Sequence, residues 1–351
     1  MIHAGVLPKA ELHVHIEGTF EPEQIFSFAE RNGVSIRYPN LDALRAVYEF
    51  TDLQSFLNLY YEALSVLRTE RDFEELTLAY LRRAQAQNVK HAEIFFDPQA
   101  HLGRGLRFET VIDGLWSALS RSERDFGITT KLIMCFLRDH PASSAMETLD
   151  LALRFQERIV GVGLDSAEVG NPPSKFVTAF ERARALGFLA VAHAGEEGPA
   201  SYVWDALDNL KVSRVDHGVR CMDDPDLVQR LRRTRMPLTV CPFSNVRLRV
   251  VPSLEQHPLR RMLDAGLLVT VNSDDPAYFG GYVGDNYTEC AKALKLSDAE
   301  LVQLACNSFE ASFIDDETRA RYYDAVQTAV TNQAERSATD RPHLLSDRVN
   351  L

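Results

Sequence analysis

Eight short runs of β-branched and other apolar residues recur along the chain, and each ends in a polar or potentially reactive residue. Runs such as IVGVGL and LLVTVN are apolar almost without interruption, which is typical of strands covered on both faces. The runs are Ala10–His15, Val89–Asp97, Thr130–Arg138, Ile159–Asp165, Phe188–His193, Arg214–His217, Pro237–Cys241 and Leu267–Asp274. The pattern predicts eight buried strands.

Segments between these runs carry apolar residues three and four positions apart, the spacing of helices with one buried face. The longest connection follows the first run, and we expect several helices there, with Tyr38–Arg68 forming a roof over a pocket. The other predicted helices are Phe73–Gln87, Phe108–Arg124, Ser144–Phe155, Ser174–Leu186, Tyr202–Leu210, Pro225–Arg233, Tyr287–Ala293, Asp298–Asn307 and Asp315–Ala334.

Strands that alternate with helices indicate βαβ units and parallel pairing. An open doubly wound sheet is the alternative to a closed barrel, but it usually carries G-x-G-x-x-G after its first strand, where this chain has HVHIEGTF. Candidate reactive residues end several different runs, as they do at the mouth of a (β/α)8 barrel. We therefore predict an α/β fold with one TIM-type (β/α)8 domain over residues 1–335, extra helices after strand 1 and at the C-terminus, and a polar tail over 336–351.

Composition narrows the possible partners of this 351-residue chain. Its 50 acidic residues outnumber 38 basic ones, for a formal net charge of −12, which disfavours a nucleic-acid partner. Five scattered cysteines without C-x-x-C argue for a reducing compartment. No apolar N-terminal segment and no run of membrane-spanning length occurs. We expect a cytoplasmic protein with a small-molecule substrate and no membrane partner; its oligomeric state stays open.

Four residues at run ends form a candidate metal centre. His13 and His15 are two positions apart on a strand, so both side chains point to one face. His193 ends the fifth run and Asp274 the eighth. Each has an ordinary structural alternative, such as a buried histidine or a turn aspartate. Together, three imidazoles and one carboxylate suit one zinc ion per chain, although iron, cobalt or manganese would also accept these ligands.

Three further residues lie close to these ligands in sequence. Glu196 follows His193 across a short turn, where a buried carboxyl would have a raised pKa and could carry a proton. The alternative is a first-turn helix glutamate. His217 ends the sixth run and could orient or deprotonate a water, or hold a developing alkoxide. Asp275 adjoins Asp274 but points away from the same ion, which leaves it free to bind a substrate or His217.

At these residues the sequence resembles the adenosine and AMP deaminase family of the amidohydrolase superfamily. The matching motifs are LPKAELHVHIEGT, HAGEEG, DHGVR, LTVCPFSN and VTVNSDDPAYFG. The resemblance implies that His13, His15, His193 and Asp274 bind the metal. It also implies that Glu196 donates a proton to purine N1, that His217 acts on the attacking water, and that Asp275 binds the purine near N7.

Within the family, VGLDSAEVGNPPSKF, AEIFFDPQ and SDDPAYFGGY look most like the adenine deaminase subgroup, which converts adenine to hypoxanthine and ammonia. Glu17 stands where adenosine deaminases have an aspartate that contacts the ribose, and its longer side chain would crowd that sugar. Glu168 stands where they have a glycine near purine N3. We hypothesise that Glu168 accepts a hydrogen bond from the free base or fills the space of the ribose. A loop glutamate paired with an arginine is the alternative.

Three other functions are alternatives to adenine deamination. The same machinery could act on adenosine or on an N6-substituted adenine. Another amidohydrolase reaction, such as ester or amide hydrolysis, is less suited to an acid placed three residues after the third histidine. A non-catalytic purine-binding barrel would predict a broken ligand set, whereas all four positions are intact. Cytidine-type deaminases use H-x-E with P-C-x-x-C, which this sequence lacks.

Overall fold

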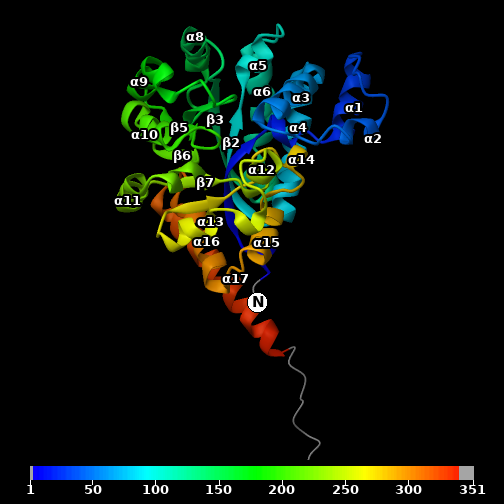
Figure 1. Ribbon diagram of the computed structural model, residues 1–351. Helices are drawn as coiled ribbons and strands as arrows, with labels where there is room; N and C mark the ends of the chain where they lie inside the picture. Colours follow the sequence, from blue (N-terminus) through cyan, green and yellow to red (C-terminus); the bar gives the residue numbers. More distant parts are fainter. Residues whose placement is uncertain (1–2, 340–351) are drawn as a thin grey trace, which may run out of the picture.

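Eight parallel strands surrounded by helices form a TIM-type (β/α)8 barrel (Figure 1). The computed structural model describes residues 3–339. Each strand pairs with its successor in the sequence, in the order β1 to β8. The strands are Lys9–His15 (β1), Val89–Phe96 (β2), Thr129–Leu137 (β3), Gly161–Asp165 (β4), Leu189–Ala194 (β5), Arg214–His217 (β6), Leu238–Val240 (β7) and Val269–Val271 (β8). The predicted fold class and strand order are confirmed.

The barrel closes where the chain beyond β8 meets β1. Val14 and Asp274 form a parallel bridge. The Asp274 N–H donates to the His13 carbonyl, and the His15 N–H donates to the Asp274 carbonyl, both at 3.0 Å. Strand β8 covers only Val269–Val271 of the predicted run Leu267–Asp274, and the backbone of Asp274 beyond it adopts φ 65°. The closing contacts therefore come from the turn that carries a candidate ligand.

The barrel interior contains a buried polar network below the strand ends. Arg214 at the start of β6 contacts Glu93 of β2 at 2.5 Å and Asp216 at 3.5 Å. All three side chains are fully buried. Buried charges are tolerated only when they are paired, so this network fixes the register of the strands beneath the site. A small apolar cluster of Phe95, Ile133, Cys135 and Val191 fills the space beside it.

The helices cover the outside of the barrel and bury one apolar face each. They are Pro22–Asn32 (α1), Leu41–Arg45 (α2), Leu53–Ala63 (α3), Glu70–Ala86 (α4), Pro98–Leu102 (α5), Phe108–Leu119 (α6), Ser122–Phe126 (α7), Ala142–Ala152 (α8), Val177–Ala185 (α9), Ala200–Asp205 (α10), Pro225–Thr234 (α11), Pro242–Arg247 (α12), Leu259–Asp264 (α13), Pro276–Phe279 (α14), Val283–Ala293 (α15), Asp298–Glu310 (α16) and Asp316–Thr339 (α17). Short 3-10 turns include Glu17–Thr19 and Pro173–Phe176, and a π-helical turn spans Ala206–Leu210.

Several helix boundaries differ from the predicted ones. The predicted helix Phe108–Arg124 is divided into α6 and α7, because Arg121 leaves the helix and its guanidinium contacts Glu74 of α4 at 2.6 Å. The short helices α5, α12, α13 and α14 were not predicted; α5 and α12 begin at a proline that a single residue separates from the end of a strand, and α14 begins at Pro276, beyond the turn that follows β8. Helix α17 continues to Thr339, four residues past the predicted domain boundary, and the rest of the predicted tail, 340–351, lies outside the described residues.

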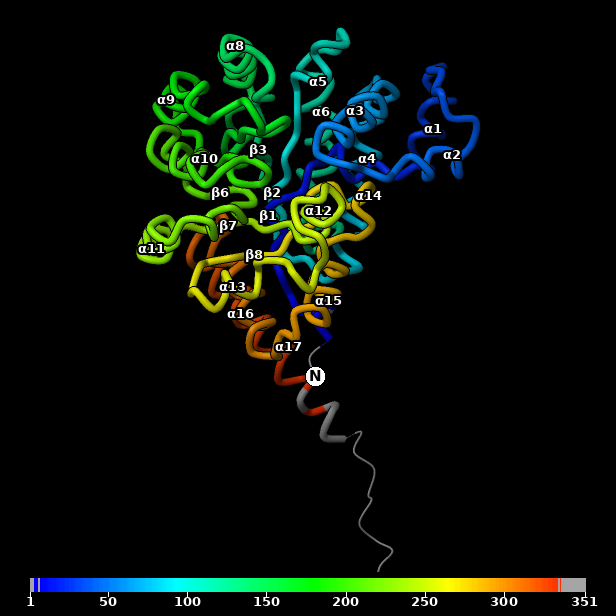
Figure 2. Tube along the Cα trace, viewed as in Figure 1, coloured from blue at the N-terminus to red at the C-terminus, as the bar shows by residue number. Residues whose placement is uncertain are grey.

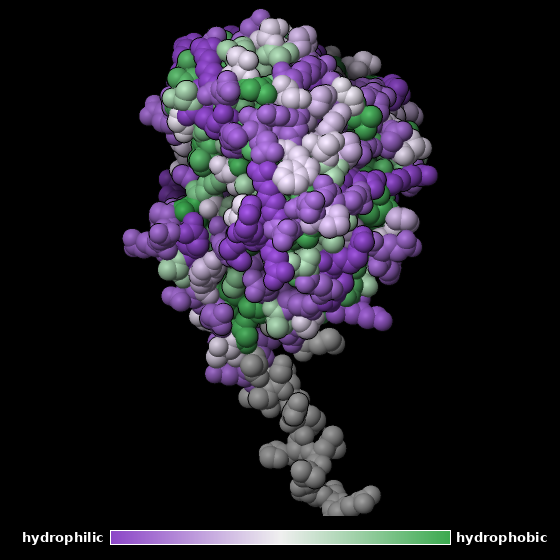
Figure 3. Space-filling model, turned by 60° about the vertical axis from the view of Figure 1, so that its left-hand side comes forward, coloured by the Kyte–Doolittle hydropathy of each residue, from purple (hydrophilic) through white to green (hydrophobic). Residues whose placement is uncertain are grey.

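The long connection after β1 contains α1 to α4, as expected. Figure 2 shows α3 in the upper part of the molecule, far from the N-terminus and α17, and the rings of Phe56 of α3 and Phe279 of α14 lie 4.8 Å apart between centroids. Polar side chains cover most of the face in Figure 3, and apolar ones are scattered on it. Among the described residues, no helix has the length and apolar character that crossing a membrane would require.

Candidate active site

The candidate ligands project from the carboxyl ends of four strands into one space. His13 and His15 lie on β1, His193 on β5, and His217 ends β6, while Asp274 follows β8. His217 and Asp274 adopt left-handed backbone conformations, with φ of 61° and 65°. Such conformations are costly for residues other than glycine and cluster at functional sites. Here they turn two side chains inward at the points where their strands end.

The distances between these side chains fit the coordination shell of a metal ion. Asp274 Oδ1 lies 3.1 Å from His13 Nε2 and 3.5 Å from His15 Nε2, and the Nε2 atoms of His15 and His193 are 3.2 Å apart. Atoms bound to zinc at about 2.0–2.1 Å in a tetrahedron lie about 3.3 Å from one another. His13 Nε2 is buried without a hydrogen-bond partner. The donor set and its spacing therefore fit one zinc ion.

His217 also lies within reach of this cluster. The candidate ligand atoms of His13, His193, His217 and Asp274 are all within 4.8 Å of one another. His217 Nε2 is 3.7 Å from Asp274 Oδ2 and 3.5 Å from Glu196 Oε2. It therefore bridges the candidate ligands and the candidate acid, a position from which it can contact a water shared between them.

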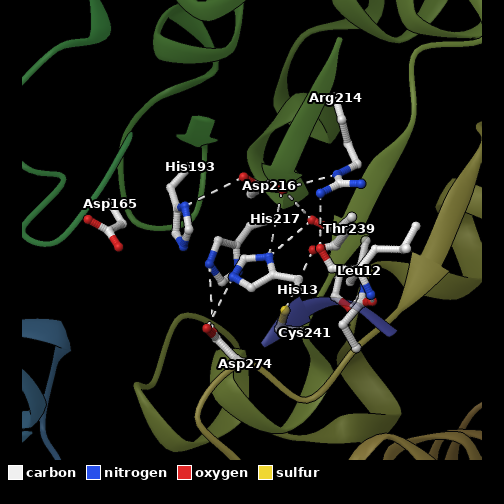
Figure 4. A network of polar contacts seen from close by, with 12 residues as sticks. Leu12, His13, Asp165, His193, Arg214, Asp216, His217, Thr239, Cys241 and Asp274 are labelled. Carbon is white, nitrogen blue, oxygen red and sulfur yellow. Dashed lines mark hydrogen bonds and ion pairs between the residues drawn. The ribbon is translucent and has the colours of Figure 1, made fainter. Parts of the chain in front are cut away.

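A second layer of polar residues holds the histidine rings. His13 Nδ1 is 3.0 Å from Thr239 Oγ1, and this hydroxyl donates to Asp216 at 2.8 Å. Asp216 Oδ2 also lies 3.7 Å from His193 Nδ1. Figure 4 shows these residues behind the rings, on the side away from Asp274. Such partners orient ligating imidazoles, so Asp216 supports His13 through Thr239 and lies close to His193 without a direct hydrogen bond.

Burial disfavours the charged forms of His15, His193 and His217. Burial lowers the pKa of His15 to about 4 and that of His217 to about 3, and it lowers the pKa of His193 well below its usual value. Burial alone would raise the pKa of Asp274, but the attraction of His13 and His217 outweighs it and lowers that pKa. Neutral imidazoles and an ionised carboxylate are the forms that bind metal.

Glu196 is the candidate acid, and its environment favours the protonated form. Its side chain is buried. Burial, then the negative charge of Asp274, then that of Glu168 raise the pKa of Glu196 well above its usual value. A carboxyl that stays protonated near neutral pH can donate a proton to a ring nitrogen. The predicted raised pKa is thus present in the structure.

Glu168 does not occupy the place that the sequence suggested. Its Oε1 accepts the N–H of Gly195 at 2.7 Å, and its Oε2 accepts the N–H groups of Glu196, Glu197 and Gly198 at 3.0, 2.8 and 2.7 Å. It is not among the residues that line the cavity. We therefore replace the hypothesis of a direct contact with the base by a positioning role, because four backbone donors already occupy the carboxylate. Among residues 3–339, no arginine forms an ion pair with Glu168 either.

Glu17 also lies behind the cavity wall. Its Oε1 accepts from His101 Nε2 at 2.8 Å and from the Asp97 backbone N–H at 3.2 Å, and its side chain is fully buried. The hypothesis that Glu17 itself faces the substrate is therefore not supported. The residue that reaches the cavity at this point is Asp97, which sequence reasoning missed. Its position directly after an apolar run was the available signal.

The structure brings Asp275 into the cavity wall, next to Asp274. Burial and the charge of Asp274 raise the pKa of Asp275 well above its usual value. Gly18 packs against it so closely that an added Cβ would lie 2.7 Å from the Asp275 Cα. A glycine at position 18 is therefore required for Asp275 to reach its place.

Helix α3 roofs the cavity, as expected for Tyr38–Arg68. Its N-terminal Leu53 N–H donates to Glu197 Oε1 at 3.1 Å, and Tyr61 donates to Ser166 at 3.0 Å. The lining residues are His15, Leu53, Phe56, Leu57, Tyr60, Tyr61, Asp97, Asp165, Ser166, His193, Glu196, His217, Leu248, Asp274, Asp275 and Phe279.

Comparisons with known proteins agree with this geometry. The model of the family described as adenosine deaminase matches residues 8–329. The chain is 63% identical over 323 residues to a protein named adenine deaminase from Streptomyces coelicolor, covering 92% of this chain and 95% of that protein. It is 56% identical over 322 residues to a protein of the same name from Chlorobium phaeobacteroides, covering 92% and 96%.

Two solved structures share the fold over nearly their full length. The crystal structure of adenine deaminase from Arthrobacter aurescens matches with a TM-score of 0.92 and 56% identity, covering 93% of this chain and 99% of that one. An amidohydrolase from Burkholderia ambifaria with bound Zn matches with a TM-score of 0.88 and 30% identity, covering 96% and 94%.

Proposed function

The chain belongs to the adenosine deaminase family, and on this premise we propose that it hydrolyses adenine to hypoxanthine and ammonia. The observation that carries the proposal is the buried Glu196 carboxyl, whose pKa is raised, beside the cluster of His13, His193, His217 and Asp274. The relatives named adenine deaminase, at 56–63% identity over most of the chain, support adenine as the substrate.

We assign His13, His15, His193 and Asp274 as the ligands of one zinc ion. The bound Zn of the Burkholderia ambifaria relative supports this assignment. When bound, zinc lowers the pKa of a coordinated water to about 7 and acts as a Lewis acid. The protein fixes this site through Thr239 and Asp216, which hold the rings from behind.

The side chains around this centre divide the reaction among them. Glu196 donates its proton to purine N1, which makes C6 electrophilic. Water adds to C6, and His217, 3.5 Å from Glu196, hydrogen-bonds the incoming oxygen and receives the proton that it releases. The C6–N6 bond then breaks as the amino group takes that proton from His217 and leaves as ammonia, and the C6 hydroxyl returns its proton to Glu196 as the C6=O bond of hypoxanthine forms. Asp275 holds the base at N7, so C6 stays above the ligand cluster.

The test is a steady-state comparison of adenine, adenosine and N6-methyladenine on enzyme of measured metal content. We expect one zinc per chain, efficient turnover of adenine, and values of kcat/KM for the other two lower by on the order of 10²-fold or more. A preference for adenosine or N6-methyladenine would reassign the substrate within the same machinery. Full activity without any bound divalent metal would contradict the ligand assignment.

A further inference from the structure

Asp97 is a buried carboxyl that faces the cavity and that the proposed reaction does not use. It directly follows β2, whose alternate residues His91, Glu93 and Phe95 face the barrel interior, and it continues that alternation. Its side chain is 2% exposed. It lines the cavity, and its Oδ1 has no hydrogen-bond partner. A buried carboxyl oxygen left unsatisfied costs free energy unless a ligand completes it.

The surroundings of Asp97 hold the carboxyl firmly in this place. Its backbone N–H donates to Glu17 at 3.2 Å, and Glu17 is itself fixed by His101 at 2.8 Å. Asp165, Tyr60 and Tyr61 line the cavity with it. Burial and the facing carboxyl of Asp165 raise the pKa of Asp97. No described cation pairs with it, so its free oxygen offers a hydrogen-bond acceptor to the cavity.

We propose that Asp97 Oδ1 accepts a hydrogen bond from the ring N–H at position 9 of a free purine base and thereby selects the base against its nucleosides. This inference rests on the proposed function. Glu196 and His217 take the N1 and C6 side of the ring, and Asp275 takes N7. The polar edge of a purine that remains is the edge with N3 and N9. Two carboxyls of the cavity remain for it, Asp97 and Asp165. Asp165 already faces the candidate ligand His15 at 3.5 Å, so Asp97 is the carboxyl that is left for this edge.

A substituent on N9 removes the donor and places carbon against the carboxyl. The oxygen of Asp97 would then stay buried without a partner, which is how binding sites reject analogues that lack one N–H. Glu17 accepts the Asp97 backbone N–H, and the charge of this neighbouring carboxyl disfavours movement of the Asp97 carboxyl toward it. The sequence suggested that Glu17 excludes the ribose of a nucleoside. Asp97 lines the cavity and Glu17 does not, so this selectivity is assigned to Asp97.

A divalent cation is the rival occupant of this position. His15, Asp97 and Asp165 place candidate ligand atoms within 4.8 Å of one another. However, His15 Nδ1 already faces Asp165 at 3.5 Å, the arrangement in which a carboxylate orients an imidazole that binds metal through its other nitrogen. Free-base recognition therefore explains the unsatisfied Asp97 oxygen better than a second ion.

The experiment compares adenine with 9-methyladenine on wild type, Asp97→Ala and Asp97→Asn. On wild type, the inhibition constant of 9-methyladenine should exceed the KM of adenine by on the order of 10²-fold or more. Asp97→Ala should raise the KM of adenine by about 10- to 100-fold, lower kcat less, and bring the two affinities within a few-fold. Asp97→Asn keeps an oxygen acceptor and should retain most of the preference.

Asp139→Ala is the matched control, because Asp139 is an exposed carboxylate near Asp165 that does not line the cavity. It should leave the affinity ratio unchanged. Wild type that binds 9-methyladenine as tightly as adenine would overturn the inference without any variant, and so would an unchanged ratio in Asp97→Ala. Loss of a second metal equivalent in that variant would favour the cation instead. Wild type without adenine turnover would refute the proposed function itself.

Discussion

The carboxylate of Glu168 accepts the backbone N–H of Glu196 at 3.0 Å, so the residue that holds the candidate acid is itself a glutamate from another βα loop. The same carboxylate binds three neighbouring N–H groups, and an added Cβ on Gly198 would lie 2.8 Å from its Cδ. The negative charge of Glu168 also helps to keep the proton on Glu196. One side chain thus fixes the position of the acid and favours its protonated form.

Glu168→Gln should lower kcat more than it changes KM. The amide nitrogen would face backbone donors, so at least one charge-assisted hydrogen bond, worth about 1.5–3 kcal/mol, would be lost. We expect kcat to fall by about 10- to 100-fold and the thermal midpoint to drop. Kinetics and thermal unfolding measure both effects, with the exposed Glu181→Gln as control. Wild-type kcat in Glu168→Gln would show that the loop holds its shape without this carboxylate.

Glu196→Gln should nearly abolish turnover while the metal stays bound. Glutamine preserves the shape of the side chain but cannot donate a carboxyl proton, and general acid catalysis contributes about 10²- to 10⁴-fold. Metal analysis and kcat on the same preparation give the comparison, and the exposed Glu181→Gln serves as control. Turnover close to that of wild type would remove Glu196 from the role of proton donor.

Asp216→Asn should weaken metal binding without touching a ligand. Asp216 accepts from Thr239, which contacts His13, and it also lies 3.7 Å from His193. Loss of such outer partners lowers metal affinity by about 10- to 100-fold. Competition with a chelator measures this change. Unchanged affinity in Asp216→Asn would mean that the rings are held by packing alone.

His257 should make the protein less stable in acid. Burial lowers the pKa of His257 to about 3. The ring Nδ1 accepts from the Leu259 N–H, and its Nε2 faces Asn245 Oδ1 at 3.1 Å. In the unfolded chain the pKa is about 6.5. The unfolded state therefore binds the proton first, and stability is lost as the pH falls below about 6.5, by up to about 1.4 kcal/mol per pH unit.

His257→Gln removes this titration, so its free energy of unfolding should fall less steeply between pH 6.5 and pH 5 than that of wild type. Denaturant unfolding at several pH values gives the two slopes. Parallel slopes would show that His257 is protonated in the folded protein.

The spacing of residues along the chain was enough to predict the eight strands, their order and the candidate ligands. Strand periodicity places His13 and His15 on one face, and the carboxyl ends of barrel strands meet at one mouth, so His193 and Asp274 could be brought to them from the pattern alone. Glu196 followed because it lies one short turn beyond His193. These inferences depend on local spacing, which the sequence records directly.

What Glu168, Glu17 and Asp97 each contact could be seen only in the folded structure. Whether a carboxylate faces a ligand or four backbone N–H groups depends on how a distant loop lies against it, and no spacing in the sequence records that distance. The left-handed backbone at His217 and Asp274 arises in the same way, since the surrounding structure compensates a conformation that neither residue favours in isolation. Local pattern selects which residues can react, and three-dimensional packing decides which of them reach the cavity.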